Sequence, residues 1–352
     1  MKVLSVIVPC YNSQDYIRRC VDSLLPSSNT QGGCVEILIV NDGSADQTGV
    51  IAEEYQTRHP SIVRVIHQDN GGHGAAVTTG VRHSTGAFIK VVDSDDWVDV
   101  ISYAKVLDTL SLFINTDEAD THGVPTCSPP DMVICNFVYE KQGRSRKKMM
   151  RYANVFPQGR VFGWNETGQF RKGQYLLMHS IIYRATVLRE SGMELPRYTF
   201  YVDNLYAYIP LKNVKTMFYL DINFYHYYIG REGQSVHEES MIRMIDQQIF
   251  VNRMMITSLD LDTVHDKRHR NYLFSYLEIV TIVSSIMLIR AGGIGNLQKK
   301  KSLWNFIRTY NRRLYHRLRY GFLGQLVNLP GPTGRSISVS MYTLSQWIIG
   351  FN

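Results

Sequence analysis

The stretch "VVDSDDWVD", Val91 to Asp99, places three carboxylates directly after a short apolar run. The run from Ala87 to Asp93 is typical of a buried strand, and Asp95 and Asp96 follow at once. Neighbouring carboxylates repel one another, and they stay ionised together where a cation compensates them. Mg²⁺ and Mn²⁺ prefer oxygen ligands and often bind substrate phosphates as well. The stretch therefore predicts a metal site at a strand end, with Asp93 and Asp95 as the preferred ligand pair.

The sequence around this stretch alternates apolar runs with helical patterns. Three further strand-like runs precede it, at Val3–Pro9, Val35–Asn41 and Ile62–His67. Between them, Ser44–Gln47 has the form of a capping box and predicts a helix that ends near Arg58. Strands buried on both faces and alternating with helices predict βαβ units and a parallel sheet, and so an α/β fold.

Polar or glycine-rich segments follow each of these four runs. They are Pro9–Asn12, Asn41–Ser44, Asn70–Gly74 and Asp93–Asp96. In open α/β sheets the ligand binds at the carboxyl ends of the strands, so the four segments are expected at one ligand-binding edge. The alternative for the acids is a helix start, because acidic residues favour the first helical turn, and Asp96 and Asp99 suit that role.

The remaining sequence divides into a second part of the sheet and a helical region. Residues 116–131 contain three prolines and predict a surface insertion, after which Met132–Tyr139 resumes as a strand. We expect one domain over residues 1–237 and a helical C-terminal region over residues 238–352. Within that region, Tyr272–Ile289 is the nearest approach to a membrane span, but its Glu278 and its Ser and Thr residues favour a buried core helix.

Charge and cysteine usage limit the setting of the protein. The formal net charge is +7 and the pI about 9.0, which favours anionic partners. The five cysteines form no C-x-x-C pair, which predicts a reducing, cytoplasmic location. Lys299–Lys301 and the stretch from Leu303 to Leu323 mix basic and aromatic residues at helical spacing. This pattern suits a helix on the anionic inner membrane face, or equally a packed terminal helix with a basic outer side.

Five segments occur in the order and approximate spacing of a known family: "SVIVPCYN", "VNDGSADQT", "NGGHGAAVTTG", "VVDSDDWVD" and "YVDNLYAYIPL". The chain thereby resembles family 2 glycosyltransferases with the GT-A fold, strongly over residues 1–100 and more weakly over 175–237. The resemblance implies a Rossmann-like, mixed but mostly parallel sheet with helices on both faces, here followed by a helical C-terminal extension.

The resemblance also implies a nucleotide-sugar donor, usually a UDP-sugar, and assigns residues to it. It places Pro9, Tyr11 and Asp42 at the base and ribose. Asp93-Ser94-Asp95 takes the place of the family's D-x-D motif, so that Asp93 lies near ribose or metal, Ser94 at the donor, and Asp95 on a Mn²⁺ or Mg²⁺ ion that neutralises the diphosphate.

Three further roles follow from the same resemblance. Asp203 takes the position of the catalytic base, with a helix N-cap as the alternative. His226 is implied as a metal ligand, or else as one more packed aromatic residue, and Arg231 as a phosphate contact.

Two positions depart from the family pattern. Val202 replaces the glutamate that usually precedes the base, and Ala76-Val77-Thr78 replaces Ala-Arg-Asn. The second departure removes a cation and leaves His73 and Lys90 as candidates to replace it.

The expected reaction is a metal-dependent, hexosyl-type transfer to an acceptor hydroxyl, with inversion by direct displacement. Its partners would be a nucleotide-sugar donor and a carbohydrate or lipid-linked glycan acceptor, not nucleic acid, in polysaccharide or glycolipid synthesis. The alternative is a nucleotide-sugar-binding protein without turnover. A sugar nucleotidyltransferase is less expected, since "PCYNSQDY" follows the first strand where such enzymes carry a glycine-rich basic loop. A Rossmann dehydrogenase would need G-x-G-x-x-G there.

Overall fold

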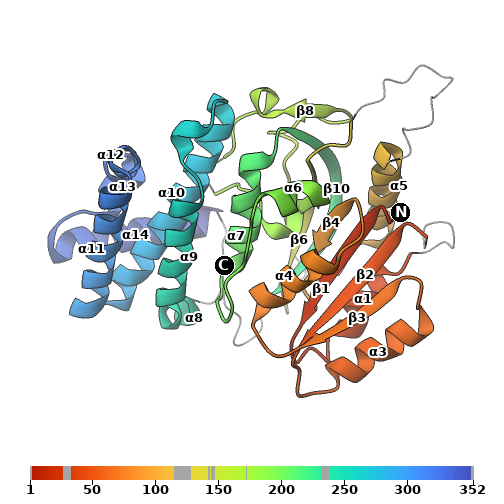
Figure 1. The fold of residues 1–352 in the computed structure, drawn as a ribbon. Coiled ribbons are helices and arrows are strands. Elements are labelled where there is room, and N and C mark those ends of the chain that lie inside the picture. Colours follow the sequence, from red (N-terminus) through yellow and green to blue (C-terminus); the bar gives the residue numbers. More distant parts are fainter. Residues whose placement is uncertain are drawn as a thin grey trace. The chain divides into compact units, whose positions relative to one another are not determined.

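The computed structural model describes residues 2–26, 33–114, 128–141, 143, 147–171, 173–230 and 238–349, and side chains up to residue 344 (Figure 1). Contacts within the chain define two compact units. The first comprises Met1–Phe170 and Leu176–Arg231, and the second comprises Arg171–Tyr175 and Glu232–Asn352. Most of the expected insertion at 116–131 lies outside the described residues.

The first unit contains a mixed sheet whose N-terminal part is parallel, as the sequence predicts. Strand β1 (Leu4–Cys10) pairs in parallel with β2 (Val35–Asp42) on one side and β4 (Phe88–Val91) on the other, and β3 (Val63–Gln68) pairs with β2. Every residue of β1, β2 and β4 is buried. These strands therefore read as continuous apolar runs because both faces of the sheet are covered.

The later strands extend the same sheet beyond β4. The order is β3-β2-β1-β4-β9-β6-β10-β5, in which β9 (Ile181–Arg184) is antiparallel to β4 and β6, and β6 (Met132–Lys141) is parallel to β10 (Thr216–Ile229). Short antiparallel strands complete it: β5 (Trp97–Val98), β7 (Lys148–Met150) and β8 (Val161–Gly163). The predicted mixed α/β class is confirmed.

Helices connect the parallel strands. They are α1 (Ile17–Leu24), α3 (Thr48–Arg58) and α4 (His73–His83). The chain moves outward from β1 to β3 and then returns to β4, so right-handed crossovers put α4 on the face opposite α1 and α3. Helix α4 packs closely on β1, because a Cβ atom at Gly80 would lie 2.3 Å from Ile7 Cγ2.

The predicted capping box at Ser44–Gln47 is wrong in its position. Helix α3 begins at Thr48, four residues after Ser44, and Asp46 Oδ1 accepts a hydrogen bond from the Thr48 backbone N–H at 3.0 Å. Ser44 instead accepts from the Asn12 backbone N–H through its hydroxyl at 3.1 Å, so it joins the loops after β1 and β2. The helices α5 (Val100–Ile114), α6 (Ala185–Glu190) and α7 (Val202–Tyr208) complete this unit.

The second unit is helical, as expected. Its helices are α8 (Glu238–Arg243), α9 (Ile245–Ser258), α10 (Lys267–Ala291), α11 (Gly293–Tyr310), α12 (Arg312–Tyr320), α13 (Phe322–Val327) and α14 (Gly331–Ile349). Helix α10 is long and apolar enough to cross a membrane, but most of it is buried. Its polar residues bond to neighbouring helices: Ser284 with Gln248, Thr281 with Asn252, and Ser285 with Trp304. The expectation of a core helix is confirmed.

Candidate active site

The carboxyl ends of β1, β2 and β4 meet at one edge of the first unit's sheet. Because β1 pairs in parallel with both neighbours, the residues that follow these strands lie side by side. The segment after β3 comes next along this edge, because β3 pairs in parallel with β2. The four polar segments singled out in the sequence therefore share one edge, which is the position where open α/β sheets bind ligands.

Asp42 at the end of β2 fixes the glycine turn that precedes α4. Its carboxylate accepts hydrogen bonds from Gln68 Nε2 at 2.6 Å and from the backbone N–H groups of Gly71 and Gly72 at 2.9 and 2.7 Å. Gly72 has φ +83°, and a Cβ atom there would lie 2.9 Å from the Tyr198 nitrogen, so only glycine fits. A carboxylate has about four acceptor positions, which leaves roughly one for a ligand. The turn places His73 at the first position of α4.

The imidazole of His73 pairs with the first acid of the cluster. His73 Nε2 lies 2.8 Å from Asp93 Oδ1. Burial acts against ionisation of Asp93, but His73, followed by His179 and Lys90, acts in the opposite direction and the pKa of Asp93 lies below its ordinary value. Burial likewise disfavours the imidazolium, yet the Asp93 carboxylate raises the pKa of His73. The two groups thus favour the charged form of one another.

Asp96 occupies a buried position beside Asp93 and is not a helix-start residue. It is 1% exposed, and its carboxylate accepts from the Tyr225 hydroxyl at 2.6 Å and from the Tyr228 backbone N–H at 2.7 Å. The Tyr225 oxygen also accepts from the Asp93 backbone N–H at 3.2 Å. Burial and the Asp93 charge raise the pKa of Asp96 well above its ordinary value. The helix-start role belongs to Asp99, whose Oδ1 accepts from the Ser102 N–H.

His179 brings a third potential ligand to these two acids. A ring nitrogen of His179 and carboxylate oxygens of Asp93 and Asp96 all lie within 4.8 Å of one another. Burial lowers the pKa of His179 to about 3, so the imidazole is neutral and able to coordinate. Its Nδ1 atom is buried and has no hydrogen-bond partner among the described residues.

This group of three fits a divalent ion. Two atoms bound to one ion at about 2.1 Å lie at most about 4.2 Å apart, so the group needs to close only slightly. Carboxylates suit Mg²⁺ and Mn²⁺, whereas imidazole favours transition metals, so the mixed set suits Mn²⁺ better than Mg²⁺. Buried polar atoms are nearly always satisfied, so the unpartnered Nδ1 of His179 is consistent with a bound group beside this ring.

Asp203 lies in the first turn of α7. The charges of His73 and Asp93 both act on the pKa of its carboxyl group. Burial raises its pKa to about 6, with His73 acting against this shift and Asp93 adding to it. The N-cap position belongs to Tyr201, so Asp203 does not cap the helix. Val202, which stands where the family has glutamate, is 2% exposed and packs in the interior.

The other predicted donor-binding residues follow β1 or lie in the acidic turn. Pro9 is buried within β1, and Tyr11 just beyond it is 54% exposed. Ser94 is buried, and its hydroxyl lies 2.7 Å from that of Ser13, so the segments after β1 and β4 are joined there. These residues border the same edge as Asp42 and Asp93. Arg231 lies outside the described residues.

Asp95 and His226 lie next to the acid cluster but outside the group of three. The Asp95 carbonyl accepts from Arg19 at 3.1 Å, and the Arg19 guanidinium lies 3.7 Å from the Trp97 ring centroid. The His226 ring stacks on the same Trp97 ring, with the two centroids 5.3 Å apart. Nδ1 of His226 lies 2.7 Å from Glu140 Oε1. His226 therefore has one nitrogen engaged by a carboxylate and a ring packed on tryptophan.

Sequence reasoning missed the roles of three residues at this site. Asp96 was assigned to a helix start, and neither His179 nor Tyr225 was singled out. Their contacts cross between β4, β10 and the 3₁₀ helix η3 (Met178–Ser180), so they depend on how the second half of the sheet pairs with the first. A polar "HS" pair immediately before the apolar run "IIYR" was the only local signal.

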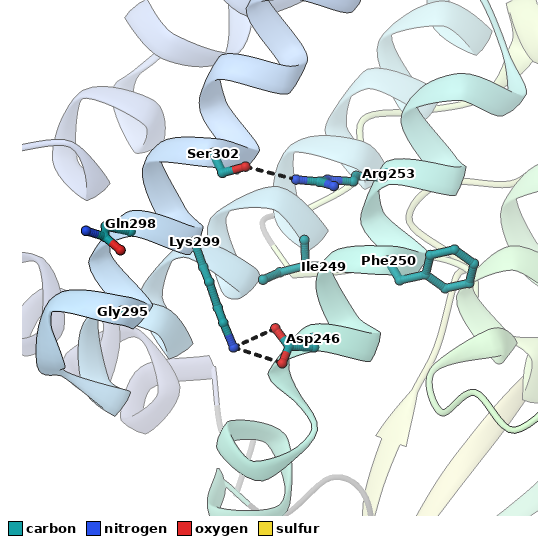
Figure 2. Close-up of a pocket in the computed structure, with 8 residues that line it drawn as sticks. All are labelled: Asp246, Ile249, Phe250, Arg253, Gly295, Gln298, Lys299 and Ser302. Atoms are coloured by element: carbon teal, nitrogen blue, oxygen red, sulfur yellow. Dashed lines mark hydrogen bonds and ion pairs between the residues drawn. The ribbon is translucent and has the colours of Figure 1, made fainter.

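The second unit has a groove of a different kind. It lies between α9 and α11, has a volume of about 540 Å³, and is lined by Asp246, Ile249, Phe250, Arg253, Gly295, Gln298, Lys299 and Ser302 (Figure 2). Its one carboxylate, Asp246, is paired with Lys299 Nζ at 2.7 Å, and Arg253 donates to Ser302 at 3.2 Å. The acidic groups suited to a metal ion and a diphosphate therefore belong to the first unit.

Comparison with known proteins identifies relatives of the first part of the chain. The model of the family "Glycosyl transferase family 2" matches residues 5–111. The uncharacterized glycosyltransferase EpsJ of Bacillus subtilis (strain 168) is 37% identical over 142 residues, which are 40% of this chain and 36% of EpsJ. The putative glycosyltransferase EpsH of the same organism is 27% identical over 264 residues, 70% of this chain and 64% of EpsH. The alignments thus span about one third to two thirds of these relatives.

Solved structures share the fold at low sequence identity. Residues 1–349 of TarS from S. aureus, in complex with UDP-GlcNAc, superpose with a TM-score of 0.66 at 18% identity, covering 97% of this chain and 92% of that one. The mannosyltransferase PcManGT from Pyrobaculum calidifontis, in complex with GDP-Man and Mn²⁺, gives a TM-score of 0.50 at 14% identity, covering 98% and 87%. These similarities establish a GT-A fold.

Proposed function

Because the chain belongs to glycosyltransferase family 2 by its residues 5–111, we propose that it transfers a sugar from a UDP-sugar to a carbohydrate or lipid-linked glycan. The reaction we propose is metal-dependent and inverts the anomeric centre. Transfer of a sugar from a nucleotide sugar is the activity that the family supports. TarS was solved with UDP-GlcNAc, which supports uracil as the base, whereas PcManGT was solved with GDP-Man.

The acidic turn after β4 is the proposed site of the donor diphosphate. A divalent ion there would act as a Lewis acid that stabilises the departing diphosphate. Asp93, Asp96 and His179 are the residues proposed to hold it, because their ligand atoms already lie within 4.8 Å of one another. Asp95 and His226, implied by family resemblance, are the alternative ligands. His73 stands at the same place and offers a cationic donor, which suits phosphate oxygens.

Asp203 is the proposed base. The acceptor oxygen attacks the anomeric carbon as the bond from that carbon to the diphosphate oxygen breaks, and the bonding pair leaves with the diphosphate. The hydroxyl proton passes to the Asp203 carboxylate. A pKa of about 6 suits this role, because a base works best when its pKa is near the operating pH. No second carboxylate is required as a nucleophile, so a single displacement with inversion follows.

One observation carries the proposal. The cluster of Asp93, Asp96 and His179 lies at the carboxyl edge of the parallel strands, electrostatically coupled to Asp203. The test is to incubate the full chain with radiolabelled UDP-sugars and GDP-mannose, with and without Mn²⁺, and with oligosaccharide acceptors. We expect Mn²⁺-dependent release of one nucleoside diphosphate together with a labelled glycan. Equal release with and without Mn²⁺ would remove the metal from the proposal.

The second candidate function is nucleotide-sugar binding without turnover. Buried Val202 in place of the usual glutamate favours it, since a partner of the base is missing. The two functions differ in one measurement. A protein that only binds the donor is stabilised against thermal unfolding by UDP and Mn²⁺ but releases no UDP from a UDP-sugar with any acceptor.

The C-terminal helices support a proposed location at an anionic membrane surface, reached from the cytoplasm. Residues 291–352 contain nine Lys and Arg residues and no Asp or Glu. The formal positive charge of this segment is therefore larger than the net charge of +7 of the whole chain. Exposed aromatic side chains accompany them, with Tyr320 59% and Phe322 67% exposed. Basic residues beside exposed aromatic rings suit the boundary between lipid headgroups and acyl chains. A lipid-linked acceptor would be found at such a surface.

A further inference from the structure

Lys90 is a fully buried lysine at the centre of the first unit. It lies in β4, three residues before Asp93, and is 0% exposed. A lysine in a strand covered on both faces is unusual, because loss of hydration strongly disfavours an ammonium group unless hydrogen bonds compensate it. The contacts of this residue must therefore account for its presence.

The ammonium group of Lys90 is bound by backbone carbonyls of a single turn. Nζ donates to the carbonyl oxygens of Met178 at 2.8 Å, His179 at 2.7 Å and Ile181 at 3.2 Å. An ammonium group has three N–H donors, so this turn uses all of them. The carbonyls belong to η3 and to the first residue of β9. Lys90 thus ties β4 to the segment that carries His179.

Aromatic side chains of β10 and β6 pack against the His179 ring. The ring stacks on Tyr225 with centroids 4.8 Å apart and contacts Tyr227 at 4.1 Å and Phe137 at 5.6 Å. Lys90 Nζ lies 4.8 Å from the centroid of the same Tyr225 ring. Tyr225 in turn donates to Asp96. Lys90 therefore contacts both the backbone of His179 and the ring that orders His179 and Asp96.

From this geometry we infer that Lys90 is a positioning residue, which holds the η3 turn so that the His179 ring faces Asp93 and Asp96. The inference rests on the metal site of the proposed function and adds a residue that touches neither metal nor donor. Without Lys90, three buried carbonyls lose their donor, and the turn rearranges to recover it. The His179 nitrogen then leaves the position in which it meets the two carboxylates.

The first experiment compares Lys90→Met with Phe88→Leu. Methionine keeps the length and burial of the side chain but removes the three donors, whereas Phe88→Leu disturbs the same buried strand at the position that pairs with Arg184, outside η3. Mn²⁺ binding to the full chain is measured by the EPR signal of free Mn²⁺, with and without UDP. We expect Lys90→Met to weaken Mn²⁺ binding about 10-fold, the lower end for residues that orient metal ligands. Phe88→Leu should stay within about two-fold of wild type.

A double-mutant cycle separates positioning from general destabilisation. His179→Phe keeps an aromatic ring in the packing and removes the nitrogen ligand. If Lys90 acts through His179, the double variant Lys90→Met, His179→Phe binds Mn²⁺ as His179→Phe does, within about two-fold. If the two losses instead multiply, Lys90 acts independently of His179 and the inference is wrong.

The remaining outcomes are equally decisive. If the wild type and Lys90→Met bind Mn²⁺ equally well, the inference about Lys90 is wrong and the proposed function stands. A wild-type protein that binds no Mn²⁺ overturns both the inference and the metal in the proposed function. If Lys90→Met does not fold, the cycle is repeated with Lys90→Gln, whose amide keeps two of the three N–H donors, and the same non-multiplying result is required.

Discussion

His73 Nε2 lies 2.8 Å from Asp93 Oδ1 and ties the first residue of α4 to the turn after β4. The sequence lacks the arginine that related sequences carry at position 77, where Val77 is 0% exposed and packs in the core. His73, held in place by Asp42 through the glycine turn, is the basic group that meets Asp93.

Replacement of His73 should impair the donor site specifically. His73→Gln keeps a hydrogen-bond donor of similar size but removes the positive charge that favours ionised Asp93. We expect kcat/KM for the donor to fall about 10- to 100-fold, as for other partners of metal ligands. His83→Gln is the control, since His83 is exposed at the opposite end of α4 and its imidazole Nδ1 lies 3.0 Å from the Thr79 carbonyl oxygen. Equal kinetics of the two variants would exclude His73 from the site.

The metal ligands can be identified by comparing three single variants. Asp96→Asn and His179→Phe remove members of the group brought together by the fold, and Asp95→Asn removes the ligand implied by resemblance. We expect the first two to weaken Mn²⁺ binding by at least about 10-fold and Asp95→Asn to weaken it less. The measurement is the same EPR titration of free Mn²⁺. The reverse order would move the ion toward Asp95 and His226.

Asp203→Asn should abolish transfer while leaving donor binding intact. The amide cannot accept the hydroxyl proton, and a positioned base contributes about 10²- to 10⁴-fold to the rate. In the wild type, kcat/KM should fall below a pH of about 6, because the carboxylate is protonated there. Thermal stabilisation by UDP and Mn²⁺ tests whether the donor site survives. Transfer by Asp203→Asn at the wild-type rate would contradict the assignment.

The same substitution should act on stability with the opposite sign. Burial raises the pKa of Asp203 from 3.8 to about 6, so the folded state favours the neutral acid. The stability contributed by this group is present below a pH of about 4 and is lost as the pH rises through about 6. At pH 7.5, Asp203→Asn should therefore raise the free energy of unfolding by about 1 to 3 kcal/mol. Urea denaturation at pH 4.5 should show a smaller gain, and a gain independent of pH would contradict the burial argument.

The parallel half of the fold could be predicted from the sequence because its signals are local. The ends of the apolar runs Val3–Pro9, Val35–Asn41 and Ile62–His67 all lie within one residue of the ends of β1, β2 and β3. Strands buried on both faces leave continuous apolar runs, and this pattern requires no knowledge of their partners. The start of α3 was misplaced because Ser44 bonds across to the loop after β1, and this contact is not visible in local spacing.

The candidate site could be predicted only in part, for a related reason. Asp42 and Asp93 were found because Asp42 ends β2 and Asp93 follows β4 in the parallel half. His179 and Tyr225 reach the acids from η3 and β10, whose pairing with the rest of the sheet depends on contacts far apart in the chain. Lys90 was noticed as a cation, but its direction, toward carbonyls and away from the edge, follows from its place in a buried strand.

The proposed association with a membrane surface can be tested by substituting exposed basic residues. Arg308 and Arg312 are exposed in the acid-free C-terminal segment, and Lys105 and Lys212 are exposed in the first unit. The variant Arg308→Gln, Arg312→Gln and the control Lys105→Gln, Lys212→Gln each remove two charges, so their net charges are equal. Each basic residue at an anionic surface contributes about 1 kcal/mol, so the first variant should bind phosphatidylserine vesicles about 30-fold more weakly. The control should bind like wild type.

Salt and lipid composition decide what this difference means. Binding that rests on these charges should weaken as the Debye length falls from about 10 Å at 0.1 M salt to about 3 Å at 1 M, and should be absent with neutral phosphatidylcholine vesicles. Phe322→Ser should weaken binding at both salt concentrations, because the insertion of an exposed ring is not screened by ions. If the two charge variants lose affinity equally, attraction depends on net charge alone. The acid-free helices would then be a basic outer face without a membrane partner.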